Sequence, residues 1–393
     1  MAEAWLSIIG VGEDGPAGLS PASLEALNEA EIVFGAKRHL ALMGIAGQPW
    51  PLPFSVTPLL AHRGQRVAVL ASGDPFWYGV GGTLSASLHP DEWRLCPTPS
   101  TFSLAAARMG WRIEEVACIG LHAAPYARLR PLLTRGARIL CLLRDGAAVG
   151  ELAQYLTAQG FGPSRIHVLQ ALGGPRENCW SFEAQHPDHQ PILSPVAAAI
   201  EVRGALGLPR SSGLDDDLFD HDGQITKRPA RALTLSALAP RAGETLWDIG
   251  TGSGSISIEF LLAAPGSRAF ALEQDPTRAA RAQANAERFG LGHRYHITQT
   301  KAPEGLDTLP KPDVVFIGGG ASEQVFADIW ARIEAGTRLV ANAVTLESEV
   351  LLSQWHARQG GTLLRVELAE AAPLGSKRGW QPLRPLVQWS VIK

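Results

Sequence analysis

Short apolar runs alternate with amphipathic stretches along the first half of the chain. The spacing of the apolar positions predicts strands at 5–9, 31–34, 67–71, 93–96, 116–120, 138–143 and 165–169. It predicts helices over 21–30, 79–88, 100–109, 125–134 and 147–159. Strands and helices that alternate in this way are typical of an α/β domain.

A polar segment interrupts this alternation. Residues 184–224 are rich in Pro, Ser, Gly and Asp, around one helical patch at 195–206. We therefore expect a first domain over 1–208, a linker over 209–225 and a second domain over 226–393. A length of 393 residues also favours two hydrophobic cores over one.

A second alternation begins at Thr226. The pattern predicts helices at 229–239, 254–263 and 276–289, with strands at 245–249, 269–273, 294–298, 313–317 and 337–343. The closing runs 362–369 and 386–392 predict a hairpin at the edge of the sheet. Since no internal repeat relates the two halves, we expect two different α/β folds.

Composition and charge narrow the class of protein. Hydrophobic content of 46% with 19% charged residues is ordinary for a globular protein, and a net charge of −3 argues against broad nucleic-acid binding. Four well-separated cysteines without a C-x-x-C pair favour reduced thiols in the cytoplasm over disulfides or zinc. No basic region precedes the first apolar run, and no apolar run reaches about eighteen residues, so we expect neither a signal peptide nor a membrane span.

The first strand leads into a literal G-x-G-x-x-G at 10–15. A dinucleotide site needs a helix at the third glycine and an acid at the end of the next strand. Here the first good helix start is Ser20 as N-cap with Pro21 behind it, and the run 31–35 ends without an acid. This loop therefore does not indicate a dinucleotide enzyme, and an NAD-dependent oxidoreductase is the weakest alternative.

The second half carries a more specific motif. A strand ending at Asp248 leads into a turn and then a helix, and the turn reads Gly250, Thr251, Gly252, Ser253 and Gly254. The next strand ends at Glu273, which can accept hydrogen bonds from both hydroxyls of a ribose. The motif resembles motif I of class I methyltransferases, which bind S-adenosylmethionine (SAM). The plainer alternative is a glycine-rich turn with an exposed acid.

Four segments extend this resemblance. TKRPARALTLSAL (226–238), TKAPEGL (300–306), DVVFIGGG (313–320) and ANAVTLES (341–348) resemble the decarboxylating methyltransferase domain of cobalamin biosynthesis, over roughly 215–393. The resemblance implies a Rossmann-like fold in which Thr226 closes the SAM pocket and Gly250 to Gly254 hold the methionine end. It also implies that Glu273 holds the ribose and that Ala302 lies beside the adenine. The family often has cysteine or another small residue at position 251 and Asp at position 273, which changes neither role.

Three segments of the first half resemble the tetrapyrrole (class III) methyltransferase fold. They are IIGVGEDG (8–15), VAVLASGDPFWYGVG (67–81) and LCPTPSTFSLAAARMGW (95–111). The resemblance implies two α/β subdomains with a second SAM between them, and the glycine loop at the border of the active-site trough. It implies SAM contacts at Gly73, Asp74, Ser100 and Thr101. The family has proline where Glu13 stands, so Glu13 is not assigned, and taken alone 73–75 also suits an ordinary turn.

A fusion of these two domains resembles the bifunctional methylases of the aerobic cobalamin pathway. The resemblance implies that the first half methylates a reduced tetrapyrrole at C5, and that the second half methylates C15 and decarboxylates the C12 acetate. Methyl transfer from SAM to an enamine-like carbon needs alignment and exclusion of water more than a dedicated base. The macrocycle itself is an electron sink for decarboxylation, so we expect no metal and assign no catalytic residue.

The acetate and propionate groups of such a substrate call for cations in the pocket. The candidates are Lys227, Arg228 and Arg231 beside the SAM turn, and Lys377, Arg378 and Arg384 in a later loop. Each cluster equally suits a solvated surface. We expect that neutralising Arg228 or Arg378 raises the KM for the substrate more than the Kd for SAM. By analogy with relatives of both halves, we also expect a homo-oligomer.

Weaker features stay open or are discounted. His186 and His189 in the Pro-rich segment, and the acidic run 215–217, suit solvated linker better than a metal site. The aromatic run 76–78 suits the core as well as it suits stacking on a macrocycle. Two other readings of the whole remain: a first half that only binds the tetrapyrrole, and two SAM domains that act on RNA.

Overall fold

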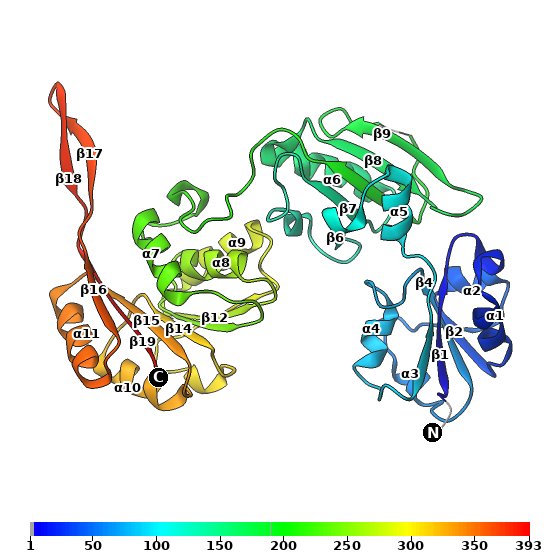
Figure 1. The fold of residues 1–393 in the computed structure, drawn as a ribbon, viewed down its shortest axis with the longest axis horizontal. Coiled ribbons are helices and arrows are strands. Elements are labelled where there is room, and N and C mark those ends of the chain that lie inside the picture. The colour runs from blue at the N-terminus through cyan, green and yellow to red at the C-terminus, as the bar shows by residue number, and fades with distance from the viewer. Residues whose placement is uncertain (1–3, 189) are drawn as a thin grey trace. The chain divides into compact units, whose positions relative to one another are not determined.

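The computed structural model describes residues 4–188 and 190–393 (Figure 1). The chain forms two compact units. The N-terminal unit comprises Met1–Tyr126 and Leu132–Leu206, and the C-terminal unit comprises Ala127–Pro131 and Gly207–Lys393.

The N-terminal unit begins with a five-stranded sheet in the order β3-β2-β4-β1-β5, in which all neighbours run parallel. Its strands are β1 (Leu6–Val11), β2 (Ile32–Gly35), β3 (Gln48–Pro49), β4 (Val67–Ser72) and β5 (Trp93–Cys96), and its helices are α1 (Pro21–Asn28), α2 (Lys37–Met43), α3 (Thr57–Leu60) and α4 (Val80–Ser85). β1 is buried along its whole length, with Ile9 and Val11 in one hydrophobic cluster and Leu6 and Ile8 in another. Burial on both faces is typical of parallel strands.

The first helix begins after the glycine loop at the position expected from the sequence. Residues Gly15–Gly18 form a short 3-10 helix, and α1 begins only at Pro21. The Ser20 side chain caps α1 by accepting a hydrogen bond from the backbone N–H of Ser23 at 3.1 Å.

A second sheet of the same unit has the order β6-β7-β10-β8-β9 and is mostly antiparallel. Its strands are β6 (Ala117–Gly120), β7 (Arg138–Leu142), β8 (Arg165–Gln170), β9 (Asn178–Glu183) and β10 (Val196–Glu201), with helices α5 (Thr101–Met109) and α6 (Ala147–Leu156). Phe102 and Ala105 of α5 pack on Leu140, Leu169 and Ala197 of this sheet.

Two predictions for this region are wrong. The helical patch at 195–206 is strand β10, because its alanine run lies between β7 and β8 and is buried on both faces. Tertiary packing thus overrides the helix propensity of alanine. The helix expected over 125–134 is only a 3-10 turn at Tyr126–Leu129.

The C-terminal unit is built on a seven-stranded sheet in the order β13-β12-β11-β14-β15-β19-β16. The strands are β11 (Thr245–Ile249), β12 (Arg268–Glu273), β13 (Tyr295–Gln299), β14 (Val314–Ile317), β15 (Arg338–Ala343), β16 (Thr362–Val366) and β19 (Leu386–Ile392). All neighbours from β13 to β15 run parallel, and β19 is antiparallel to both β15 and β16. The expected mixed α/β fold and the hairpin pairing at the sheet edge are both present.

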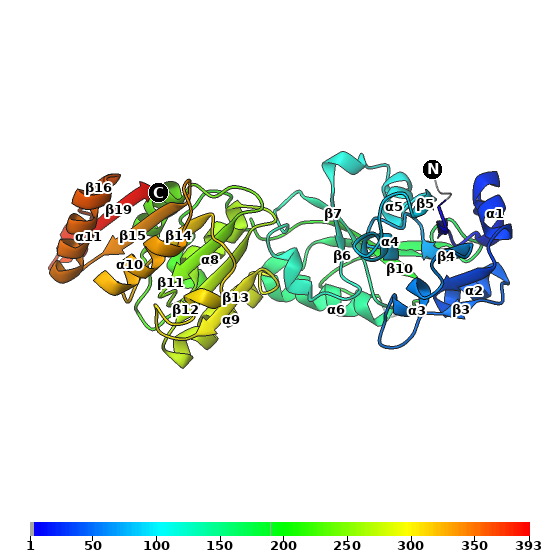
Figure 2. The same cartoon turned by 90° about the horizontal axis from the view of Figure 1, so that it is seen from below.

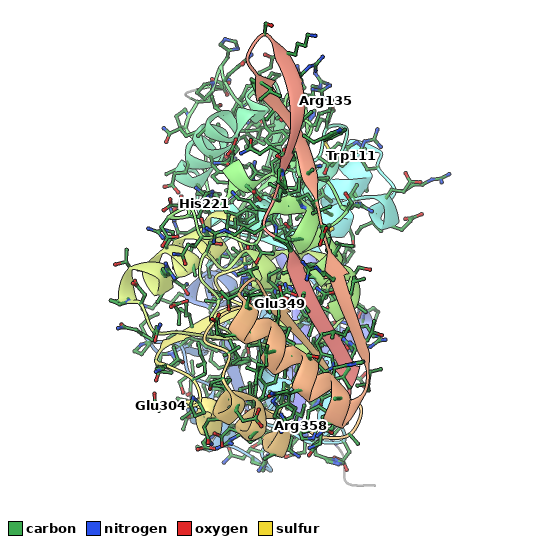
Figure 3. The ribbon with its side chains drawn as sticks, turned by 90° about the vertical axis from the view of Figure 1, so that its left-hand side faces the viewer. Trp111, Arg135, His221, Glu304, Glu349 and Arg358 are labelled. Carbon is green, nitrogen blue, oxygen red and sulfur yellow. The ribbon has the colours of Figure 1, made fainter. Side chains whose placement is uncertain are left out.

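Five helices belong to this sheet: α7 (Arg228–Leu238), α8 (Ser255–Ala263), α9 (Pro276–Arg288), α10 (Glu323–Arg332) and α11 (Leu346–Gln359). α11 packs against β15, β19 and β16 (Figures 1 and 2). Glu349 and Arg358 both lie on α11 (Figure 3), where Arg358 pairs with Glu323 at 2.8 Å and lies over the ring of Trp355. Between β16 and β19, β17 (Ala369–Leu374) and β18 (Lys377–Pro382) form a separate two-stranded ribbon that the sequence did not predict (Figure 1).

The strand order of this sheet reverses between β11 and β14, since β12 and β13 follow on one side and β15 on the other. Ligands of open parallel sheets bind at the carboxyl ends of the strands at such a reversal. Among the described residues, no helix is both long enough and apolar enough to cross a bilayer.

Candidate functional site

A cavity of about 920 Å³ opens at the carboxyl ends of β11 and β14. Small-molecule sites usually measure roughly 300–1,000 Å³. The cavity is lined by nine of the residues that the sequence assigned to SAM or substrate, namely Thr226, Lys227, Gly250, Thr251, Gly252, Ser253, Glu273, Ala302 and Arg384. Gly254 does not line it, and instead forms the N-cap of α8 with a φ of 77°.

The glycine turn brings bare backbone to the wall of this cavity. Gly250 has a φ of 71°, and a Cβ there would lie 2.7 Å from the carbonyl oxygen of Gly319. Gly252 has a φ of 58°, and a Cβ there would meet only the carbonyl oxygen of Gln224, at 4.0 Å. The first glycine therefore permits a close approach of two loops, and the second leaves open space that a side chain would fill.

Glu273 stands at the end of β12 with its carboxylate fixed on both sides. It accepts hydrogen bonds from the backbone N–H groups of Gly252 and Asp275, each at 3.0 Å, and it is 5% exposed. An ionised carboxylate has about four acceptor positions, so two oxygens held in this way keep lone pairs for ligand hydroxyls. The open space at Gly252 and the acceptors of Glu273 fit the nucleoside of SAM.

A cluster of buried polar side chains holds the glycine turn to the protein core. Asp248 accepts hydrogen bonds from the hydroxyls of Thr251 at 2.6 Å and Ser257 at 2.5 Å. Burial raises the pKa of Asp248 to about 6. The Thr251 hydroxyl also lies 3.1 Å from the hydroxyl of Tyr295, whose pKa is likewise raised by burial. Thr251 thus holds the turn to the core.

Four cations line the same cavity: Lys227, Arg278, Lys301 and Arg384. Arg278 is paired with Asp222 at 2.8 Å, and Lys227 lies 3.5 Å from Asp216. Lys301 and Arg384 have no acidic partner within ion-pair distance among the described residues. Lys301 was not expected from the sequence, although it directly precedes Ala302 in the segment that carries the resemblance.

The structure corrects the assignment of Arg231. This side chain is fully buried, with Nε 2.5 Å from Glu259 and Nη1 3.0 Å from Asp216. Its guanidinium also lies over the ring of Phe219, 4.8 Å from the ring centre. A buried group with these partners is not open to a substrate carboxylate. Its contacts instead fasten the segment before α7 to α8.

Three other expected cations do not line the cavity. Arg228 is exposed and pairs with Asp215. Lys377 and Arg378 lie at the start of β18, where they pair in register with Leu374 and Pro373 of the ribbon. Contact of these three with substrate stays a prediction.

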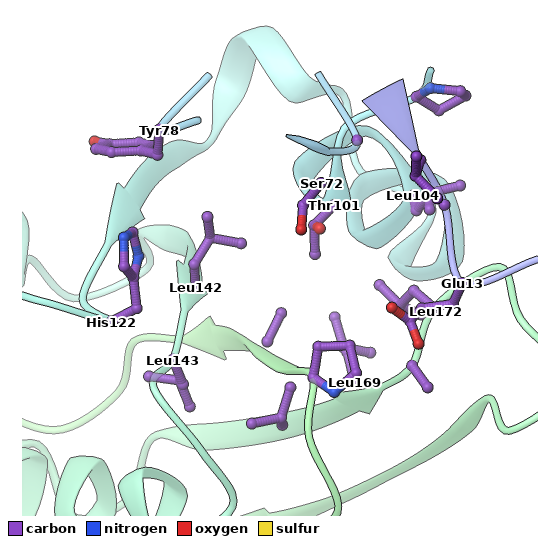
Figure 4. Close-up of a pocket in the computed structure, with 18 of the residues that line it drawn as sticks. Glu13, Ser72, Tyr78, Thr101, Leu104, His122, Leu142, Leu143, Leu169 and Leu172 are labelled. Atoms are coloured by element: carbon purple, nitrogen blue, oxygen red, sulfur yellow. The ribbon is translucent and has the colours of Figure 1, made fainter. Parts of the chain in front are cut away.

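A second, smaller cavity of about 240 Å³ lies in the N-terminal unit (Figure 4). It is bordered by the segments that follow β1 and β4 and by the start of α5. Gly73 and Thr101, two of the four SAM residues expected here, line it. Tyr78 and His122 lie on one side of it, and Glu13 and Leu172 on the other (Figure 4).

The other two expected SAM residues do not line this cavity, and their side chains accept hydrogen bonds from backbone groups of their own loops. Asp74 accepts a hydrogen bond from the backbone N–H of Phe76 at 2.9 Å, which closes a turn. Ser100 is buried and caps α5 by accepting from the N–H of Ser103 at 3.0 Å. Their contact with SAM stays a prediction.

Three polar side chains of this cavity were not expected from the sequence. Glu13, which was left unassigned, lines it and is paired with Arg38, which also lines it, and with Arg176 at 3.0 Å. Ser72 completes this set and accepts a hydrogen bond from Arg38 at 2.8 Å. The departure from proline at position 13 was the one signal in the sequence.

Two side chains of the aromatic run 76–78 pack on other rings, and the third lines the cavity. The ring of Phe76 packs on that of Trp93 at 5.1 Å, and the ring of Trp77 packs on that of Phe102 at 4.9 Å. Tyr78 has a φ of 59° and is the one member of the run that lines the cavity.

The discounted metal sites gain no support. His186 is exposed and lies 3.6 Å from Glu183, and His189 lies outside the described residues. Asp216 is occupied by Arg231. Within 4–188 and 190–393, no group of three or more His, Cys, Asp or Glu side chains is placed to hold a metal ion. All four cysteines are unpaired.

Comparisons with known proteins agree with this two-part organisation. Residues 6–187 match the family described as tetrapyrrole (corrin/porphyrin) methylases, and residues 217–393 match the precorrin methyltransferase domain. A precorrin-6Y C(5,15)-methyltransferase [decarboxylating] from Sinorhizobium sp is 47% identical, covering 99% of this chain and 96% of that protein. The protein of the same name from Mycobacterium tuberculosis (strain CDC 1551 / Oshkosh) is 38% identical, covering 98% and 99%.

Shorter relatives match one part of the chain. A probable cobalt-precorrin-6B C(15)-methyltransferase (decarboxylating) from Pyrobaculum aerophilum is 33% identical, covering 44% of this chain and 91% of that protein. The crystal structure of the C-terminal domain of precorrin-6Y C5,15-methyltransferase from Rhodobacter capsulatus is 52% identical, covering 47% of this chain and all of that one, with a TM-score of 0.46.

Proposed function

The chain belongs to the family of precorrin-6Y C5,15-methyltransferases (decarboxylating), and we propose from this premise that its two units carry out separate methylations. Members of this family are SAM-dependent methyltransferases of cobalamin biosynthesis, and they also decarboxylate their tetrapyrrole substrate. In the proposal, the C-terminal unit methylates C15 and decarboxylates the C12 acetate, and the N-terminal unit methylates C5.

The cavity of the C-terminal unit carries this proposal. Its glycine turn and Glu273 are suited to hold one SAM, which when bound supplies an electrophilic methyl group. A relative named for C15 methylation and decarboxylation alone spans 44% of this chain, so that pair of reactions needs only about half of it.

Other residues of the same cavity are suited to hold the tetrapyrrole. Lys301 and Arg384, which lack acidic partners among the described residues, offer two positive charges to the carboxylates of the substrate. Asn342 offers an amide in a fixed orientation, because its Nδ2 donates to Thr234 at 2.8 Å and its Oδ1 accepts from Gln388 at 3.0 Å. Substrate held at several points is aligned for transfer and shielded from water.

Decarboxylation in this cavity needs no additional reagent. The carbon–carboxylate bond of the acetate breaks, CO2 leaves, and the electron pair enters the conjugated macrocycle. A proton taken up at the same carbon then leaves a methyl group in place of the acetate. We assign no side chain as the donor of that proton.

The N-terminal unit would hold a second SAM between its two sheets, at Gly73 and Thr101. A second candidate function follows from one observation. The cavity there measures about 240 Å³, below the usual size of a small-molecule site, so it accommodates a whole SAM less well than the C-terminal cavity does. Without a second SAM, this unit would bind tetrapyrrole and transfer no methyl group.

Paired glycine variants test the division of labour. Gly252→Val fills the open space in the C-terminal cavity. Gly73→Val crowds the wall of the N-terminal cavity instead, because Gly73 has a φ of 54° and a Cβ there would lie 3.1 Å from the carbonyl oxygen of Pro99 and from the Cα of Ser100. We expect each to slow its own step by about 100-fold, because an ångström of misplacement already costs that much. Product mass should show a single added methyl for each variant, with CO2 lost for Gly73→Val, because the C-terminal cavity is unaltered there.

Two further glycines serve as controls. Gly64 and Gly243 have the same left-handed backbone, lie in open space and do not line a cavity, so their valine variants should make the full product. Two methyls added by Gly73→Val at the normal rate would favour the binding-module function.

A homo-oligomer and a cytoplasmic location remain parts of the proposal. In support of self-association, the β17–β18 ribbon exposes Leu374 and Trp380, which are 70% and 78% exposed. Sedimentation of the full chain tests this point.

A further inference from the structure

A charged cluster borders the N-terminal cavity and lies outside the proposed SAM contacts. Glu13 and Arg38 are the cavity-lining residues with a full charge, and Glu13 is paired with both Arg38 and Arg176. The Glu13 side chain is 11% exposed, whereas those of Arg38 and Arg176 are 39% and 54% exposed. The acid is therefore shielded, and both guanidinium groups stay open to a ligand.

The cluster has one more positive charge than negative, since two guanidinium groups share one carboxylate. Acidic residues next to the cluster in the sequence do not neutralise this excess positive charge. The carboxylate of Asp14 lies over its own loop, where a Cβ on Gly18 would be 2.1 Å from it, and Asp74 closes its own turn. Glu177 is paired with Arg108. The excess positive charge favours an anionic ligand beside this cavity.

Arg38 is held in position by neutral groups as well. Its Nη2 donates to Nε2 of His39 and to the hydroxyl of Ser72, each at 2.8 Å. Burial, together with the charge of Arg38, lowers the pKa of His39 to about 4, so that at neutral pH Nε2 is free to accept. A guanidinium has five N–H donors, so an arginine fixed in this way keeps others for a carboxylate.

We propose that Arg38 binds a carboxylate side chain of the tetrapyrrole, and that Glu13 occupies this position at Arg38 until the substrate arrives. The inference rests on the proposed function, because a substrate that loses CO2 from an acetate group is an acid. When the substrate binds, its carboxylate replaces Glu13 at Arg38, and Glu13 remains with Arg176. Exchange of one carboxylate for another avoids leaving a guanidinium without a partner.

The two partners of the ion pair then have opposite effects on substrate affinity. In the full chain, Arg38→Gln should raise the KM for the tetrapyrrole in C5 methylation by about tenfold, as expected for loss of a charge-assisted contact. Arg38→Lys should give an intermediate value. Glu13→Gln should lower the same KM by roughly threefold, because it removes the competing carboxylate. Neither change should alter the Kd for SAM.

Arg66→Gln is the matched control, because Arg66 is exposed, pairs with Glu31 and does not line the cavity. A KM that moves in the same direction in Arg38→Gln and Glu13→Gln, or in neither, would show that the pair is only structural and would overturn the proposal. Absence of C5 methylation by the unaltered chain would instead contradict the proposed function. In that case, the Kd for precorrin-6Y without SAM, measured by the absorbance of the tetrapyrrole, replaces the KM. Arg38→Gln should raise this Kd and Glu13→Gln should lower it.

Discussion

The two cavities differ in how the chain builds them. In the C-terminal unit, one contiguous stretch from Asp248 to Glu273 supplies both the glycine turn and the acid, around a space of about 920 Å³. In the N-terminal unit, several segments separated along the chain meet around about 240 Å³, and an ion pair of Glu13 with Arg38 borders that space. A cavity lined by one local motif is thus easier to predict from the sequence than one assembled from distant segments, of which only Gly73 and Thr101 were identified here.

The largest expected difference between the two units is in how their stability depends on pH, because each has a buried titratable group beside its cavity. Burial lowers the pKa of His39 to about 4 and raises that of Asp248 to about 6. The unfolded chain protonates His39 near its ordinary value of 6.5, so the N-terminal unit loses stability as the pH falls from 6.5 to about 4. The folded C-terminal unit protonates Asp248 before the unfolded chain does, so it gains stability as the pH falls from about 6 to 3.8.

Calorimetry of neutral variants separates the two contributions. Relative to His39→Gln, the unaltered N-terminal unit should lose roughly 3 kcal/mol between pH 7 and pH 4, since a shift of one pKa unit corresponds to about 1.4 kcal/mol. Relative to Asp248→Asn, the C-terminal unit should gain a similar amount over the same range. If the stabilities of both units changed in the same direction between pH 7 and pH 4, the predicted difference between them would be wrong.

A smaller effect concerns the cations of the C-terminal unit. Arg384 lines the cavity, and Arg378 lies on the β17–β18 ribbon. We expect Arg384→Gln to raise the KM for the tetrapyrrole about tenfold, or about 1.4 kcal/mol, through loss of a charge-assisted contact. Arg378→Gln tests the assignment made from the sequence, and it raises the same KM if the ribbon reaches the substrate. Arg241→Gln is the matched control and should leave the KM unchanged, because Arg241 is exposed, pairs with Glu244 and does not line the cavity. An unchanged KM for Arg384→Gln beside a raised KM for Arg378→Gln would place the contact on the ribbon and contradict the prediction for Arg384.

Much of the fold and of the C-terminal site follows from sequence patterns. The strands and helices expected between Thr226 and Ala343 are all present, because apolar period, turn glycines and capping residues agree there. Strand β10 was predicted as a helix, because the pairing that buries its alanines comes from strands distant in sequence. The burial of Arg231 could not be predicted, because Glu259 becomes its partner only when α7 packs on α8.

The local and assembled sites also differ in what the sequence shows of their chemistry. Glu273 was identified because it follows the glycine turn at a typical interval. Arg38 and Ser72 were missed, because only the parallel pairing of β2 and β4 brings the segments that carry them together.

The central claim is that each unit binds its own SAM, and titration calorimetry of the full chain tests it most directly. The account predicts two SAM molecules per chain, with one lost in Gly252→Val and the other lost in Gly73→Val. A single SAM per chain that only Gly252→Val abolishes would contradict the claim, and would leave the N-terminal unit as a tetrapyrrole-binding module.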